Sequence, residues 1–228
     1  MAAAAAAATV PTTAATSATC PRQQAAVLEH LFSADCADCW AAPADGEPAS
    51  PRSAAAAPAW RFDWIGPGAD AAPLAAGALP EATERAQRLG MALPGGQTGQ
   101  VHRQAASAAL AGLRVSVASG PAWQGYFGVQ LTLRSSQAKA LPTGSSAWVA
   151  LIEQVGAGSD GTPVTRALVR SVAGPLPLAA LAPGKALTHL RALRWPTGTE
   201  PSHLQARAWI EGPDGRLLAV AADRCPDR

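Results

Sequence analysis

The sequence has few lysines, few aromatic residues and no clusters of charge. Its basic residues include only two lysines, Lys139 and Lys185, and 18 basic against 16 acidic residues leave a net charge of +2. The arginines are scattered, with no basic run and no interleaved aromatic residues, so we expect no nucleic-acid partner. Once the alanine-rich start is set aside, no apolar run reaches the ~18 residues of a membrane span. We therefore expect no membrane span.

Several catalytic signatures are also missing. No glycine-rich run follows a strand and opens a helix, as a nucleotide site requires. There is no Gly-x-Ser-x-Gly motif, and the carboxylates are dispersed, so hydrolase chemistry has no support. We therefore expect no bound cofactor.

The chain starts with a weakly apolar segment, MAAAAAAATVPTTAATSATC, which has no charge before Arg22. Thr16-Ser17-Ala18 fits the small-x-small pattern of a signal-peptide cleavage site. We interpret residues 1–20 as a residual export signal or a disordered tail. Export predicts a periplasmic or secreted location.

Cysteines are few and even in number, four in all. Cys20 and Cys225 lie near the two ends of the chain, and chain ends often meet in compact folds. In an oxidising compartment the two predict a structural disulfide, Cys20–Cys225. That leaves Cys36 and Cys39 for each other.

Residues 21–112 have the pattern of a mixed α/β unit. Strands are predicted over 25–33 and 60–65, where apolar and aromatic residues concentrate. A helix is predicted over 79–90, because Pro80 and Glu81 suit its start and Gly90 its end. A second helix is predicted over 102–112.

From residue 113 the period changes to that of strands. The seven runs expected to form strands are LRVSVAS, YFGVQLTLR, SAWVALIEQVG, VTRALVRSV, KALTHLRALRW, SHLQARAWIEG and RLLAVAADR. Strands at this spacing predict an antiparallel β-sandwich of immunoglobulin-like size over residues 113–228.

Side-chain directions follow from the alternation within these runs. In SHLQARAWIEG, Leu204, Ala206, Ala208 and Ile210 should point inward, and Gln205 and Arg207 outward. For the tryptophans we expect core or cross-strand packing, at Trp60, Trp64, Trp123, Trp148, Trp195 and Trp209.

The Cys-x-x-Cys pair follows a predicted strand, as in thioredoxins. There the first thiol lies at a helix N-terminus, where N–H groups stabilise a thiolate, and the second resolves the mixed disulfide. The sequence resembles a secreted proteobacterial thioredoxin-like family of unknown function, in the spacing of Glu29, Ser33, Cys36 and Cys39 and in the pair Asp63 and Trp64. The resemblance implies an α+β fold class: a reduced thioredoxin-like unit followed by the β-sandwich. It also implies a catalytic redox pair at Cys36 and Cys39, with a thiol substrate or protein partner that it does not identify.

Weak reactivity is expected of that pair. Asp35 and Asp38 place negative charge beside the thiols, which raises a thiol pKa, and Pro43 shortens the helix that follows. Two alternatives stay open. One is a non-enzymatic secreted binding or structural module stapled by both disulfides. The other is a metal site at Cys36, Cys39 and His30, which is disfavoured because no further cysteine or histidine pair completes four ligands.

Overall fold

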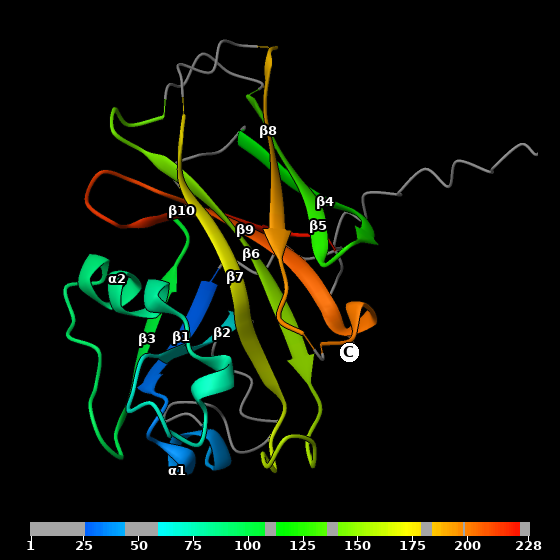
Figure 1. Ribbon diagram of the computed structural model, residues 1–228. Helices are drawn as coiled ribbons and strands as arrows, with labels where there is room; N and C mark the ends of the chain where they lie inside the picture. Colours follow the sequence, from blue (N-terminus) through cyan, green and yellow to red (C-terminus); the bar gives the residue numbers. More distant parts are fainter. Residues whose placement is uncertain are drawn as a thin grey trace, which may run out of the picture.

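In the computed structural model of the chain, the described residues are 26–43, 59–107, 113–135, 141–178, 184–197 and 199–223. They form two β-sheets and a few short helices (Figure 1). The strands are β1 (Ala26–Ser33), β2 (Ala59–Gly66), β3 (Gly99–Ala105), β4 (Leu113–Trp123), β5 (Tyr126–Ser135), β6 (Ser146–Val155), β7 (Arg166–Pro177), β8 (Ala186–Arg194), β9 (Leu204–Glu211) and β10 (Leu217–Ala222). The helices are α1 (Ala37–Ala41), α2 (Pro80–Arg88) and the 3₁₀ turns η1 (Ala75–Gly77) and η3 (Pro201–His203).

The larger sheet has seven strands in the order β10-β9-β6-β7-β2-β1-β3. It is mixed, because β1 pairs with β2 and β2 with β7 in parallel, whereas the other neighbours are antiparallel. The smaller sheet is antiparallel, with the order β4-β5-β8. Both sheets contain strands that are far apart in the sequence.

One core fills the space between the two sheets. Along β5 every second residue from Phe127 to Leu133 is buried, which is the alternation of a strand with one face on a core. The facing residues of the larger sheet come mainly from β6 and β9: Ala147, Val149, Leu151, Leu204, Ala206, Ala208 and Ile210. The inward positions predicted along β9 are therefore correct.

A second core lies on the opposite face of the larger sheet, beneath α2. Ala82 and Ala86, one helical turn apart, are both fully buried and place the helix close to the sheet. The sheet contributes large aromatic side chains here: Trp60, Phe62, Trp64, Trp148 and Trp209. Since the larger sheet is covered on both faces, strands such as β1 are buried at every residue.

Most of the predicted elements are present. The strands predicted over 25–33 and 60–65 are β1 and β2, and the seven predicted from residue 113 onward are β4 to β10. The helix predicted over 79–90 is α2, with Pro80 at its start and Gly90 at a φ of 71° just after its end. The residues that predict these elements lie within or next to each element, so the local sequence was enough to predict them.

The predicted fold class, a reduced thioredoxin-like unit followed by a β-sandwich, is wrong. The described residues contain two α-helices, and α1 has only five residues. β1 and β2 do not form the centre of a thioredoxin-like α/β core, because they are inner strands of the seven-stranded mixed sheet. The outer edges of this parallel pair are taken by β3, which pairs with β1 along its length, and by β7, which pairs with β2 at Asp63 and Leu168.

The helix predicted over 102–112 is also wrong where that range is described. Residues 99–105 form β3, which pairs antiparallel with β1 along its length. Pairing with an otherwise open sheet edge outweighs the local helix preference of an alanine-rich segment.

The outward direction predicted for Arg207 is wrong for a similar reason. Arg207 is buried, and its guanidinium lies over the Trp60 ring, 4.7 Å from the centroid. The face of β9 that was expected to meet solvent is covered by the second core. The domain boundary predicted between residues 112 and 113 stays a prediction, although strands from both sides of it share the larger sheet.

Candidate functional site

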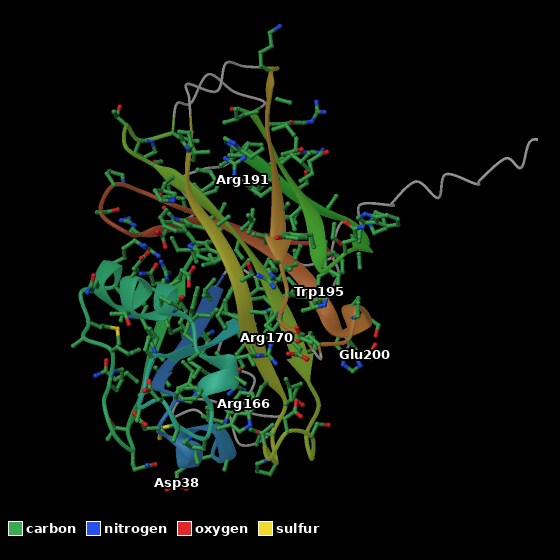
Figure 2. The ribbon with its side chains drawn as sticks, in the orientation of Figure 1. Asp38, Arg166, Arg170, Arg191, Trp195 and Glu200 are labelled. Atoms are coloured by element: carbon green, nitrogen blue, oxygen red, sulfur yellow. A yellow bond between two sulfur atoms is a disulfide. The ribbon has the colours of Figure 1, made fainter. Side chains whose placement is uncertain are left out.

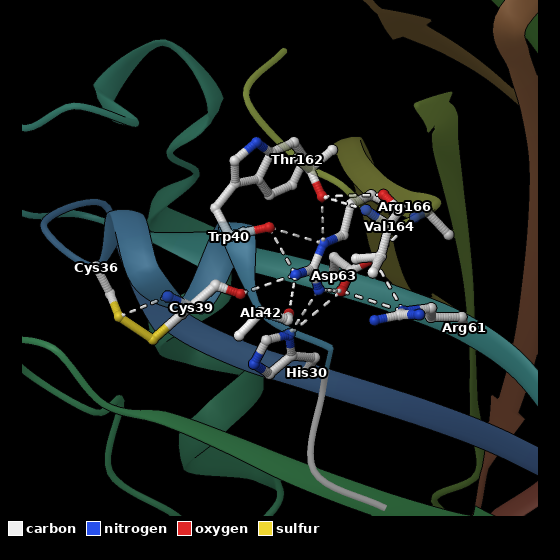
Figure 3. A network of polar contacts seen from close by, with 11 residues as sticks. His30, Cys36, Cys39, Trp40, Ala42, Arg61, Asp63, Thr162, Val164 and Arg166 are labelled. Atoms are coloured by element: carbon white, nitrogen blue, oxygen red, sulfur yellow. Dashed lines mark hydrogen bonds and ion pairs between the residues drawn. A yellow bond between two sulfur atoms is a disulfide. The ribbon is translucent and has the colours of Figure 1, made fainter. Parts of the chain in front are cut away.

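Cys36 lies in the turn between β1 and α1, Cys39 lies within α1, and the two are joined as a disulfide (Figure 3). The Cα atoms are 5.3 Å apart and the sulfurs 1.97 Å. Cys36 is the N-cap of α1, and its sulfur accepts a hydrogen bond from the Cys39 N–H at 3.1 Å. The predicted strand–turn–helix placement, close enough for a disulfide, is confirmed.

Both sulfur-bearing residues are shielded from solvent. Cys36 is 0% exposed and Cys39 9% exposed. They pack in a small apolar cluster with Phe32, Ile65 and Leu168. Thiol–disulfide exchange requires an attacking thiolate to reach a sulfur atom, so this burial opposes a fast reaction.

Asp35 braces the turn that carries the disulfide. Its carboxylate accepts hydrogen bonds from the Ser33 hydroxyl at 2.9 Å and from the Ala69 N–H at 3.1 Å. Gln97 donates its amide N–H to the Asp35 carbonyl at 2.9 Å. The turn is thus tied to two distant segments of the chain. Asp38, the second acidic neighbour in the sequence, is exposed.

The other end of α1 is capped by Arg166, the first residue of β7, which is completely buried. Its guanidinium donates to the carbonyl oxygens of Cys39 at 2.9 Å, Trp40 at 2.6 Å and Ala42. A helix leaves its last carbonyls without intrahelical partners, and an arginine with five N–H donors can satisfy several at once. A helix of five residues is too short to be stable alone, so these bonds fix its position.

Arg166 also joins α1 to a buried charged cluster. His30 of β1 and Asp63 of β2 are register partners, and the Asp63 carboxylate lies 3.3 Å from His30 Nδ1. The Arg166 Nη1 lies 3.3 Å from the same carboxylate, Arg61 Nε lies 3.2 Å from it, and the Ala167 N–H donates to it at 2.8 Å.

Burial of this kind would by itself raise the pKa of Asp63. The hydrogen bond with His30 and the charges of Arg61 and Arg166 outweigh it, and they hold the pKa of Asp63 below its ordinary value. The carboxylate is therefore ionised at neutral pH and neutralises the buried arginine.

His30 lies between this carboxylate and the disulfide (Figure 3). A Cβ atom placed on Gly99, the first residue of β3, would lie 2.7 Å from His30 Nε2 and 3.4 Å from Cys39 Sγ. Both atoms therefore border one small space, which only a glycine leaves free. His30 Nδ1 faces the Asp63 carboxylate and Arg166 Nη1, each at 3.3 Å, so Nε2 is the ring nitrogen on the side of the disulfide. The order carboxylate, imidazole, sulfur is the one chemical feature of this site that favours reactivity.

A cavity of about 330 Å³ lies beside Trp40, on the same apolar cluster. Its wall contains Ile65, Leu74 and Leu168, and one side carries the ion pair of Arg170 with Glu153 at 2.5 Å. Arg170 follows Arg166 along β7 (Figure 2). Neither cysteine lines this cavity. Its volume lies at the lower end of the range for small-molecule sites.

A second buried charged cluster holds α2 on the sheet. Arg85 donates to both carboxylate oxygens of Glu29 at 2.7 Å and also to Glu211, while Trp64 Nε1 donates to Glu29 at 3.0 Å. Burial would lower the pKa of Arg85, but the two glutamates raise it above its ordinary value. Glu29 and Trp64, two residues of the family resemblance, are therefore joined in one structural network.

The remaining predicted sites have different outcomes. Cys20 and Cys225 lie outside the described residues, so their disulfide stays a prediction. The redox role of Cys36 and Cys39 stays a prediction too. For the metal alternative, the described residues hold no group of three or more His, Cys, Asp or Glu side chains arranged for a metal ion. Both sulfurs of the pair are bonded to each other.

Comparison with known proteins adds no family. No protein-family model matches the chain, and no curated protein matches it significantly. Within the described residues, no helix has the length and apolar character needed to cross a membrane. The function is therefore inferred from the geometry of the site.

Arg166 was not among the residues predicted for the site, and His30 was predicted only as a ligand in the metal alternative. Arg166 lies more than a hundred residues from the carbonyls that it binds, and nothing in the local run VTRALVRSV marks it as buried. The nearest signal was the strand placement of His30 and Asp63. Both were expected on strands, and only the parallel register makes them neighbours.

Proposed function

We propose that this protein is a non-enzymatic binding module of an oxidising compartment, periplasmic or secreted, in which the Cys36–Cys39 disulfide is structural. One observation carries the proposal: the disulfide is buried at the base of a helix that Arg166 locks at its other end. Attack on Cys36, which is 0% exposed, requires the turn to open. A disulfide in that setting contributes stability rather than turnover.

The reduction potential tests this proposal. A structural disulfide in a secreted protein has a potential below about −300 mV, and catalytic ones lie well above that value. We expect Cys36–Cys39 to equilibrate below about −300 mV with dithiothreitol buffers, with the thiols trapped by alkylation and counted by mass spectrometry. We also expect no catalysis of insulin reduction. A higher potential together with insulin turnover would overturn the proposal.

A second candidate is slow thiol–disulfide exchange, which the position of His30 favours. A thiolate of a substrate dithiol would attack Cys39 Sγ, the S–S bond would break, and Cys36 would leave as the thiolate. The second substrate thiol would then release Cys39, so that the substrate is oxidised to a disulfide and the pair is reduced. His30 Nε2, which borders the same space as Cys39 Sγ, would hold the proton for the Cys39 thiolate released in this second step.

His30→Gln separates the two candidates, because a glutamine side chain cannot pass a proton to a thiolate. If exchange is the function, this variant slows the oxidation of a dithiol peptide. If the disulfide is structural, the wild type and His30→Gln oxidise the peptide at the same uncatalysed rate. The exposed Asp38→Asn variant serves as the matched control.

A further inference from the structure

The exposed large apolar side chains of the described residues are gathered on one sheet. They are Trp123 (73% exposed), Tyr126 (47%) and Leu190 (67%), and all three belong to the β4-β5-β8 sheet. The inner face of this sheet covers the first core. Its outer face lies on the side of the molecule away from α1 and α2 (Figure 1). Trp123 thus departs from the core packing expected of the tryptophans, and exposed apolar side chains gathered in one place mark an interaction surface.

The strand register arranges this outer face in rows. Trp123 pairs with Tyr126, and Tyr126 pairs with Arg194, so the two rings and one guanidinium form the row at one end. The next full row is Ala118, Gln130 and Leu190, and then comes Ser116, Thr132 and Thr188. Arg114, Arg134 and Ala186 form the row at the opposite end, about 27 Å from the first.

The charge of this face has one sign. Strands β4, β5 and β8 contain no aspartate and no glutamate. Arg114 and Arg134 are exposed and directly opposite each other, an arrangement that repels and destabilises a strand pair. Within the described residues neither of them, nor Arg194, forms an ion pair. At the edge of the sheet, the Asp223 carboxylate accepts a hydrogen bond from the Ser119 hydroxyl at 2.5 Å. It accepts a second one from the Ala206 N–H in the larger sheet.

The middle of the face is mostly polar, and Leu190 is its one large exposed apolar side chain. Gln130 donates to the Thr132 hydroxyl at 3.3 Å, and Thr132 lies 3.5 Å from Thr188 across the strands. Hydroxyl and amide groups on short side chains can donate and accept hydrogen bonds without blocking a flat ligand. The face therefore offers aromatic rings at one end, hydroxyls in the middle and paired guanidinium groups at the other end.

We propose that the outer face of the β4-β5-β8 sheet binds an acidic polysaccharide, a chain of sugars that carry carboxylates. The proposal rests on the proposed binding function and names its ligand class. A sugar ring presents C–H groups that pack on the faces of Trp123 and Tyr126. Its hydroxyls match Gln130, Thr132 and Thr188, and its carboxylates form charge-assisted hydrogen bonds with Arg114, Arg134 and Arg194.

Two other classes of partner fit less well. A single-stranded nucleic acid needs aromatic side chains spaced along the strand for successive bases, whereas here both rings lie in one row. A stable protein interface has an apolar, tightly packed centre, whereas the two central rows of this face hold four polar side chains and one large apolar one, Leu190. A mostly polar centre flanked by rings and arginines suits an extended chain of acidic sugars.

Titration calorimetry with a hexamer of galacturonic acid tests the proposal on the full chain. The matched ligand is the same hexamer with its carboxylates methyl-esterified, which keeps the sugar and removes the charge. We expect the acid hexamer to bind more tightly than the ester. We expect Trp123→Ala, and separately Arg114→Gln with Arg134→Gln, to weaken binding about tenfold or more. Exposed Arg216→Gln, between β9 and β10, should leave binding unchanged.

Each other result overturns the proposal. Absence of binding by the wild type, or equal binding of acid and ester, excludes recognition of acidic sugars. Tighter binding of an oligothymidine would assign the face to nucleic acid. Equal loss in Arg216→Gln would show that net charge, and not this face, attracts the hexamer. A high potential of Cys36–Cys39 would refute the proposed function separately, because that measurement involves no ligand.

Discussion

At the residue scale, Asp63 is the group on which the disulfide region depends electrostatically. It is wholly buried and faces Arg61, Arg166 and His30, and its pKa lies below the ordinary value. A carboxylate with a depressed folded-state pKa contributes stability above its unfolded pKa, and that contribution is lost as the pH falls through the folded pKa. The unfolded pKa of aspartate is about 3.9.

We therefore predict that Asp63→Asn destabilises the protein by about 3–5 kcal/mol at neutral pH, because it leaves buried guanidinium charge uncompensated. The difference from wild type should be constant from pH 7 to about 5 and shrink as the pH falls below about 4. Urea unfolding followed by tryptophan fluorescence measures it, with the exposed Asp38→Asn as control. A difference that stays the same down to pH 2.5 would contradict this account.

Arg207 is a second residue whose environment the sequence did not reveal. Alternation placed Ala206 and Ala208 inward correctly, and the same rule placed Arg207 in solvent. Burial instead lowers the pKa of Arg207 to about 10, although the charges of Asp223 and Asp63 raise it. Alternation indicates which residues share a face of a strand, but it cannot tell whether a second layer covers the other face.

At the element scale, α1 is the helix with the least intrinsic stability and the most support from outside. Its N-terminus is closed by Cys36, and its C-terminal carbonyls are held by Arg166. The Trp40 indole N–H donates to the Asp160 carbonyl at 2.6 Å and ties the helix to the loop before β7. The sequence predicted a helix start at the cysteines and an early stop near Pro43, but not these partners.

Replacing Arg166 by methionine should release this helix. The substitution removes the donors of three carbonyls and the partner of Asp63, and breaking a buried charge pair costs about 3–5 kcal/mol. We expect a lower urea midpoint and faster hydrogen exchange at the amides of residues 39–42. The control is the exposed Arg114→Met variant, whose urea midpoint should stay close to that of the wild type. Arg166→Lys keeps the charge, so its midpoint should lie between those of Arg166→Met and the control. An unchanged midpoint in Arg166→Met would show that the bonds to α1 contribute nothing.

A comparison of α2 with β3 shows which elements can be predicted from neighbouring residues alone. Pro80, the acidic first turn and Gly90 predicted α2 because each acts within its own helix. The segment 99–105 becomes a strand because β1 has an open edge at that position, and Gly99 fits against His30 and Cys39. Nothing within HRQAASAALAG carries that information, so a helix was expected.

At the scale of the whole molecule, the sequence showed where strands lie but not which of them are neighbours. The change of period at residue 113 predicted a second unit. However, β6, β7, β9 and β10 extend the sheet that holds β1 to β3. The candidate site depends on this arrangement, because β1, β2 and β7 supply His30, Asp63 and Arg166 respectively. Which strands pair over long range depends on the total surface that the pairing buries. The sequence of a single strand does not reveal it.

The shared sheet allows the domain boundary expected between residues 112 and 113 to be tested by unfolding. Two independent domains would unfold in two transitions, whereas a sheet that runs through both parts couples them. We expect one urea transition, with the same midpoint by tryptophan fluorescence and far-UV circular dichroism. Amides of β1 and β9 should exchange with the same free energy of opening, because both strands lie inside the larger sheet. Two separate midpoints, or protection of β9 without protection of β1, would support the boundary and show that the β2–β7 pairing contributes little to stability.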